Sequence, residues 1–108
     1  MANRTATLTL LLASVSTAQV NHATLSGVVT DATGAVVQRT EITAADNSTG
    51  AKRTTHTDAS GRYAFTRLLP GTYQVTAQRQ GFNTHIQKGV VLAVGADATL
   101  DIDRKSVV

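Results

Sequence analysis

The chain has no cysteine, no tryptophan and only one proline among its 108 residues. Because cysteine is absent, neither disulfides nor thiolate metal sites can form, and a folded core must be held by packing alone. Aromatic residues are also scarce, and the four present are Tyr63, Phe65, Tyr73 and Phe82. The rest of the core must therefore come from Val, Leu, Ile and Ala. A chain of this length forms one domain at most, with a modest core.

Acidic residues are outnumbered, with 7 Asp and Glu against 10 Lys and Arg, which gives a formal net charge of +3. The basic residues are scattered, and the only adjacent pairs are Lys52-Arg53 and Arg104-Lys105. A nucleic-acid-binding surface usually has a denser basic stripe with interleaved aromatic residues. We therefore interpret these charges as solvated outer faces and expect no nucleic-acid partner.

Apolar residues do not run long enough for a membrane-spanning helix, which needs about 20 of them. The N-terminus instead has Arg4, a short apolar run over residues 8–15, and small residues at 16–18. This order is typical of a secretion signal. We predict a signal peptide over residues 1–18 and an exported chain that does not itself span a membrane. The alternative is that the run forms a first strand or a buried helix of the domain.

The strongest pattern in the sequence predicts two antiparallel strands between residues 58 and 79. Asp58 to Gly61 has the composition of a tight turn, because Asp can accept a hydrogen bond from its own backbone and Gly tolerates a positive φ. Apolar and polar residues then alternate over 62–68 and again over 72–79, on either side of Pro70-Gly71. Period-two alternation on both sides of a turn is typical of half-buried antiparallel strands.

The remaining chain has the same character, with short alternating segments and no sustained helical period after residue 20. Strands are expected over 24–30, 52–57, 84–92 and 98–103. A further strand is expected to begin near 35–37 and, after a break at residues 38–39, to resume over 40–44. About seven strands at this spacing predict an all-β sandwich. We expect the domain to cover residues 19–103 and residues 104–108 to form a loose tail. The predicted core is Leu25, Val29, Ile42, Tyr63, Phe65, Leu68, Tyr73, Val75, Phe82, Val90, Leu100 and Ile102.

Three spaced motifs carry a resemblance to a known family. They are Asp-x-x-Gly-x-Tyr-x-Phe over 58–65, Leu-x-Pro-Gly-x-Tyr-x-Val over 68–75, and Gly81-Phe82. Together they resemble the carboxypeptidase regulatory-like domain, which is related to transthyretin-like and Cna B-type modules. The resemblance covers roughly residues 23 to 103. It implies a seven-stranded antiparallel Greek-key β-sandwich of the prealbumin type, with a carbohydrate-binding-like fold.

The same resemblance implies a bacterial, exported accessory role. Similar domains stand at the N-terminus of TonB-dependent outer-membrane receptors, ahead of a plug and a barrel that a chain of this length cannot contain. We therefore expect a free-standing accessory module or a truncated receptor, located in the periplasm or at the outer membrane. Its expected partner is a protein or the parent receptor. The alternative function is that of a carbohydrate-binding module.

No residue set that supports catalysis or metal binding is found. The three histidines, His22, His56 and His85, lie outside any zinc-ligand spacing. Asp58 and Ser60 are explained by their turn, and no Gly-x-Ser-x-Gly motif accompanies them. The carboxylates Asp31, Asp46 and Asp58 fit turn formation better than calcium binding. We predict no enzymatic activity, no cofactor, and no catalytic, cofactor-binding or metal-binding residues.

The polar segment over residues 52–57 is expected at the edge of a sheet, where unpaired backbone groups can accept a partner strand. Sugar binding would instead need an exposed aromatic ring. The alternation predicts that Tyr63, Phe65 and Tyr73 are buried and that Phe82 plugs one end of the sandwich. A protein partner is therefore favoured over a carbohydrate.

The predicted signal peptide can be tested on the exported protein. Cleavage should follow Ala18, because small residues occupy the positions that a signal peptidase reads. Mass spectrometry should then find Gln19 at the mature N-terminus. An intact Met1 on protein that stays in the cytosol would contradict the prediction.

Overall fold

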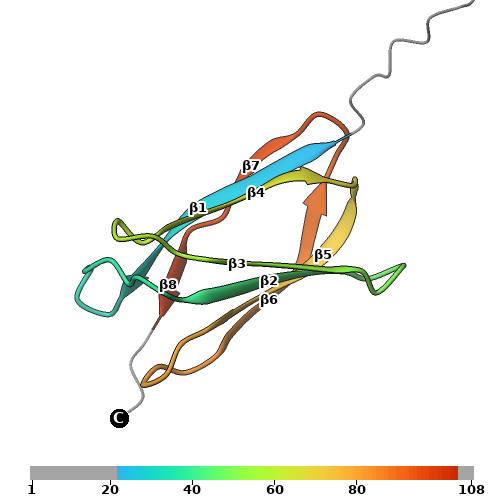
Figure 1. The fold of residues 1–108 in the computed structure, drawn as a ribbon. Helices are drawn as coiled ribbons and strands as arrows, with labels where there is room; N and C mark the ends of the chain where they lie inside the picture. The colour runs from blue at the N-terminus through green and yellow to red at the C-terminus, as the bar shows by residue number, and fades with distance from the viewer. Residues whose placement is uncertain (1–21, 105–108) are drawn as a thin grey trace, which may run out of the picture.

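The computed structural model describes residues 22–104, so the predicted signal peptide and residues 105–108 lie outside the described range. The described residues form strands and turns without a helix (Figure 1). Accordingly, this part of the chain has no helix with the length and apolar character needed to cross a bilayer. The strands are β1 (Ala23–Asp31), β2 (Glu41–Asp46), β3 (Lys52–His56), β4 (Arg62–Leu68), β5 (Gly71–Gln78), β6 (His85–Leu92), β7 (Asp97–Thr99) and β8 (Ile102–Arg104).

These strands form two four-stranded sheets that pack face to face. One sheet has the order β4-β1-β7, with β8 also paired to β1, and the other has the order β3-β2-β5-β6 (Figure 1). The all-β sandwich predicted from the sequence is confirmed. The described residues contain eight strands where seven were predicted, and β8 extends to Arg104, one residue past the predicted end of the domain.

The core lies between the two sheets and follows the period-two pattern of the sequence. Phe65 and Val75 are fully buried, and the Tyr63 ring packs edge-on against Phe65 with their centroids 6.1 Å apart. Nine of the twelve predicted core residues are buried, namely Leu25, Val29, Ile42, Tyr63, Phe65, Leu68, Tyr73, Val75 and Ile102. The other three, Phe82, Val90 and Leu100, are half-buried against the core. Val37 and Leu92 are buried without having been predicted.

The last predicted strand is the main departure from the expected antiparallel topology. Residues 98–103 were expected to form one strand, but the structure has two short ones, β7 and β8. Both run parallel to β1, with Leu25 opposite Ala98 and Val29 opposite Ile102. The chain is interrupted between them at Leu100 and Asp101.

A close approach of the backbone to Gly27 explains this interruption. The Leu100 carbonyl lies where a side chain at position 27 would be, since an added Cβ would stand 1.9 Å from its oxygen. That carbonyl accepts a hydrogen bond from the hydroxyl of the buried Tyr63. It is therefore turned away from the ladder, and the Val28 N–H donates to the Asp101 carboxylate at 3.0 Å instead. Only glycine leaves room for this arrangement on β1.

The turn between β4 and β5 is fixed by a tyrosine. Pro70 and Gly71 make the corner, as the sequence predicted, and the Tyr73 hydroxyl donates to the carbonyl of Leu69 at 2.7 Å. This bond matches the tyrosine corner seen in other β-sandwiches. Burial, followed by the nearby charge of Asp46, raises the pKa of Tyr73 above its ordinary value, so the hydroxyl stays a donor.

Candidate functional site

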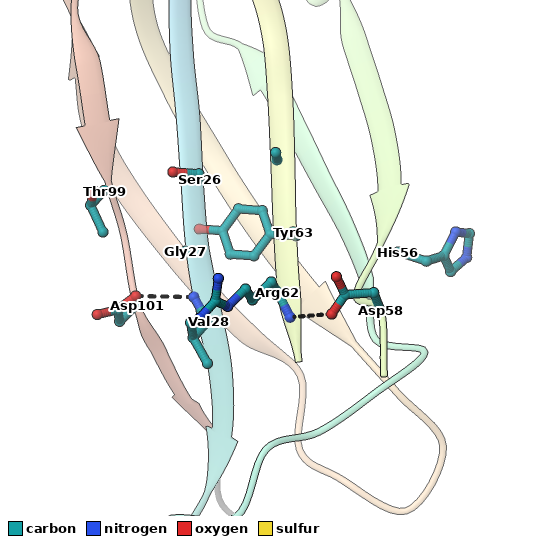
Figure 2. Close-up of a pocket in the computed structure, with 10 residues that line it drawn as sticks. Ser26, Gly27, Val28, His56, Asp58, Arg62, Tyr63, Thr99 and Asp101 are labelled. Atoms are coloured by element: carbon teal, nitrogen blue, oxygen red, sulfur yellow. Dashed lines mark hydrogen bonds between the residues drawn. The ribbon is translucent and has the colours of Figure 1, made fainter. Parts of the chain in front are cut away.

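An open groove of about 530 Å³ lies over β1, β4 and the segment between β7 and β8 (Figure 2). Ser26 and Val28 come from β1, Arg62 and Tyr63 from β4, and Asp101 from the interruption between β7 and β8. Ser26, Val28 and Arg62 are there because alternate residues of each strand face out of the sandwich while their neighbours form the core. His56, Asp58 and Thr99 also line the groove.

Two hydrogen bonds beside this groove hold β1 and β4 to the segment between β7 and β8. The Asp101 carboxylate accepts the Val28 N–H (Figure 2). The Tyr63 hydroxyl donates to the Leu100 carbonyl. Burial, with a smaller contribution from the charge of Asp101, raises the pKa of the Tyr63 phenol well above its ordinary value. The hydroxyl therefore remains protonated at physiological pH and acts as a structural donor.

The Asp58 carboxylate, which also lines the groove, accepts hydrogen bonds within its own turn. It accepts the backbone N–H groups of Ser60 and Arg62 at 2.9 and 3.0 Å. These bonds, the one from Arg62 first, hold the pKa of Asp58 below its ordinary value. The geometry explains the Asp-x-x-Gly sequence, because the Gly61 N–H closes the same turn on the Asp58 carbonyl at 2.9 Å.

The other two predicted turn aspartates behave alike, which confirms their structural role. Asp31 accepts the hydroxyl of Thr33 at 2.6 Å and its N–H at 2.9 Å, and these bonds lower the pKa of Asp31. Asp46 accepts the N–H and the hydroxyl of Ser48 at 2.8 and 2.9 Å, and its pKa is lowered for the same reason.

The groove does not bring together a nucleophile and a base. The imidazole of His56 points away from Tyr63 and Arg62 in Figure 2. Its recorded charged partner is Glu41, whose carboxylate lies 3.9 Å away on the neighbouring strand β2. His22 precedes β1 and His85 begins β6. Within residues 22–104, no three His, Asp or Glu side chains gather where they could hold a metal ion.

A second, more polar groove of about 580 Å³ lies at one end of the other sheet. Its floor is the row of His56, Glu41 and Gln78, which are paired across β3, β2 and β5. Arg39, Arg79, Gln80 and Thr84 complete its walls. Sequence reasoning did not find this site, because it is assembled from the ends of three strands.

Arg39 reaches this groove from a β-bulge. Its φ of 59° lies in the left-handed region that a non-glycine residue rarely adopts, at a cost of about 1 kcal/mol or more. Arg39 and Thr40 both face Thr57, since the Arg39 N–H donates to the Thr57 carbonyl and the Thr57 N–H to the Thr40 carbonyl, each at 3.0 Å. The buried Thr57 hydroxyl fixes the bulge by accepting the Thr40 N–H and donating to the Val37 carbonyl. The break in alternation at residues 38–40 was the sequence signal of this bulge.

The third feature is the free edge of β3, which confirms the predicted position of this segment. β3 pairs only with β2. The residues that flank β3 are hydrogen-bonded to residues at the two ends of β2. The Asp46 N–H donates to the Ala51 carbonyl at 2.8 Å, and the Thr57 N–H donates to the Thr40 carbonyl at 3.0 Å. Bonded and non-bonded pairs alternate along an antiparallel ladder. The backbone groups that face away from β2 are therefore those of Lys52, Thr54 and His56.

The other sheet edges of the described residues are protected. The Arg53 guanidinium donates to the carbonyls of Thr66 and Arg67 at 3.2 and 3.5 Å, and so covers part of the β4 edge. β6 is kinked by an irregularity in its pairing with β5, where Gly89 has a φ of 72°. β7 and β8 have three residues each. Bulges and short strands are recognised means of blunting an edge. β3 has five residues and pairs with β2 without a register shift, so it is the regular edge strand among the described residues.

A family model described as the carboxypeptidase regulatory-like domain matches residues 24–105. This match covers most of the chain, so the chain belongs to the carboxypeptidase regulatory-like domain family. The resemblance inferred from the motifs around Tyr63 and Tyr73 is confirmed. No curated protein matches the chain.

Solved structures share the fold at low identity. A candidate carbohydrate binding protein from Bacteroides uniformis is 21% identical over 77% of this chain and 41% of its own, with a TM-score of 0.63. Catechol 1,2-dioxygenase from Acinetobacter sp. ADP1 is 11% identical, and the match covers 82% of this chain and 54% of the dioxygenase chain, with a TM-score of 0.65. A chain of a type II cohesin–X-dockerin complex from Acetivibrio cellulolyticus is 22% identical, and the match covers 78% of this chain and 58% of that one, with a TM-score of 0.61. This chain thus spans about half the length of these structures, and the likeness shows the fold alone.

The hydrogen bonds to Asp58 predict an acid-dependent loss of stability. Because its pKa is lower in the folded than in the unfolded chain, its contribution is complete above about pH 4 and is lost as the pH falls through the folded pKa. Asp58→Asn keeps a carbonyl acceptor in the turn but does not titrate. Thermal unfolding followed by circular dichroism should show a flatter dependence of Tm on pH below 4 for this variant.

Asp97→Asn is the matched control, since it also removes one carboxylate from an exposed position, in β7. It should keep the acid-dependent slope of the wild type. Equal slopes for Asp58→Asn and the wild type would contradict the role given to the Asp58 turn.

Proposed function

We propose that this chain is an exported, non-catalytic docking module that binds a protein partner through the free edge of β3. The observation that carries the proposal is the outward-facing backbone of Lys52, Thr54 and His56 on a regular edge strand. Such an edge can accept a further strand, whose main chain supplies affinity while its side chains supply specificity.

The charges on β3 agree with this role. Lys52 and Arg53 are exposed on an edge that would otherwise pair with a second copy of itself. Positive charges on both copies discourage that pairing. They leave the edge open to a partner strand that is neutral or acidic.

Two further observations support a role without catalysis. Of the polar groups that line the first groove, Tyr63 and Asp101 form hydrogen bonds that hold the fold, and Asp58 closes its turn. The proposed export rests on the pattern of Arg4, the apolar run 8–15 and the small residues 16–18. The resemblance extends the proposal to a bacterial outer-membrane receptor, either as its accessory domain or as a separate module acting beside it.

A carbohydrate-binding module is the second candidate. The open groove beside Ser26, Arg62 and Thr99, with a volume of about 530 Å³, has room for a monosaccharide and offers hydroxyl and guanidinium groups. The similar fold of the candidate carbohydrate binding protein from Bacteroides uniformis favours the same reading. Against it, Tyr63, Phe65 and Tyr73 are buried, so none offers a ring face on which a sugar could stack.

The experiment compares strand addition with sugar binding on residues 19–108. Peptides selected from a displayed random library would be titrated into the labelled domain and followed by NMR, in parallel with a panel of oligosaccharides. The key variant is Thr54→Pro, because the Thr54 N–H faces the free edge and its loss leaves the backbone hydrogen bonds to β2 intact. Apart from the N–H, it removes the exposed hydroxyl contact of Thr54 with Thr43, which is 3.3 Å long. Its folding is checked by the amide spectrum.

We expect selected peptides to shift the amides of Lys52, Thr54 and His56 in the wild type and to bind at least tenfold more weakly to Thr54→Pro. The oligosaccharide titrations should stay flat. Saturable shifts at Ser26, Arg62 and Thr99 on adding an oligosaccharide would make this a carbohydrate-binding module. Peptides that bind Thr54→Pro as tightly as the wild type would refute docking at β3.

A further inference from the structure

The second groove contains two arginines without a carboxylate partner. Among residues 22–104, the ion pair that lies in this groove is His56 with Glu41, and neither Arg39 nor Arg79 is within 4.0 Å of an acidic side chain. Glu41 is the one carboxylate among the groove-lining residues. The groove thus presents two unneutralised guanidinium groups to solvent in a chain whose net charge is already positive.

The surrounding structure restrains the side chain of Arg79 and the backbone of Arg39. The Arg79 guanidinium carbon lies 5.8 Å from the centroid of the Phe82 ring, a cation–π distance that restrains the side chain. Arg39 projects from the bulge that Thr57 fixes through four hydrogen bonds to residues 37–40. A guanidinium that is restrained before binding loses less freedom when it meets an anion.

From this arrangement we infer that the groove binds the carboxylates of an acidic peptide segment in the partner protein. Arginine suits this chemistry, because its planar fork can donate two parallel hydrogen bonds to one carboxylate. The side chains of Gln78, Gln80 and Thr84 in the same groove can pair with the backbone amides of such a segment. The inference rests on the proposed function, since it names the kind of partner that docks at β3.

The position of the groove favours a peptide over an acidic saccharide. His56 lines the groove and is also the last residue of β3, so the groove continues directly into the free edge. A chain that leaves the groove can therefore pair with β3. The Arg79 guanidinium lies over one face of the Phe82 ring, so that face is already in use and is not open for stacking with a sugar.

The test uses two synthetic decapeptides of alternating Thr and Glu or alternating Thr and Gln, titrated into residues 19–108 by isothermal calorimetry and NMR. The Glu peptide should bind at least tenfold more tightly than the Gln peptide, and raising the salt from about 50 to 300 mM should reduce this difference because the charges are exposed. Arg39→Gln with Arg79→Gln should weaken the Glu peptide about tenfold and leave the Gln peptide unchanged.

The matched control is Arg67→Gln with Lys88→Gln, which removes the same charge from two exposed positions outside the groove. It should leave the affinity for the Glu peptide within about twofold of the wild type. Equal losses in the two double variants would show that only net charge matters and would overturn the inference. Failure of the Glu peptide to bind the wild type would overturn it as well.

Two other outcomes separate this inference from the proposed function. If Thr54→Pro abolishes peptide binding while the Arg39 and Arg79 variant does not weaken it, docking at β3 stands and the acidic partner is refuted. If a uronic-acid oligosaccharide binds in an Arg39- and Arg79-dependent manner and the Glu peptide does not, the groove serves an acidic saccharide and the inference is wrong.

Discussion

The contact between the Leu100 carbonyl and the face of Gly27 is the constraint on which the rest of the sandwich depends. β1 is the inner strand of its sheet, bonded to β4 on one side and to β7 and β8 on the other. The C-terminal segment can follow β1 only by passing over Gly27. At this point the Tyr63 hydroxyl donates a hydrogen bond to the Leu100 carbonyl. The same tyrosine packs against Phe65 in the core. One glycine and one phenol therefore couple the last strands to the centre of the fold.

Once the strands are fixed in this way, the positions of the functional surfaces follow. The aromatic residues are mostly used to build the core and the corner between β4 and β5, which leaves few ring faces for ligands. Asp31, Asp46 and Asp58 close turns. The groups that we propose for recognition are the backbone of β3 and Arg39 and Arg79 beside it. This division of the side chains underlies our proposal that the module docks a partner.

Much of the fold could be predicted from local signals in the sequence. Alternation located Tyr63, Phe65, Tyr73 and Val75 in the core, and the Asp58 and Pro70 turns set the register between them. The parallel pairing of β7 and β8 could not be predicted, because alternation at Ala98, Leu100 and Ile102 is the same for either strand direction. The close approach to Gly27 comes from Leu100, 73 residues further along the chain, so the sequence around Gly27 does not indicate it.

The candidate sites were predicted unevenly for the same reason. The edge position of residues 52–57 followed from their own polar, β-branched composition. The groove of Arg39 and Arg79 did not, because its residues come from the ends of β2, β3 and β5 and meet only in three dimensions. The bulge at Arg39 was visible as a break in alternation, but the sequence does not show which way a bulged side chain points.

Native-state hydrogen exchange of Gly27→Ala tests the central constraint most directly, with Gly71→Ala as the matched glycine control. An alanine Cβ at 27 would meet the Leu100 oxygen at 1.9 Å, whereas at 71 it meets only the end of the Asp46 side chain at 3.3 Å. The account predicts that Gly27→Ala costs about 3 kcal/mol and removes protection from the amides of Val28 and Leu100. Gly71→Ala should leave both amides protected. Unchanged protection at Val28 and Leu100 in a folded Gly27→Ala variant would contradict the account.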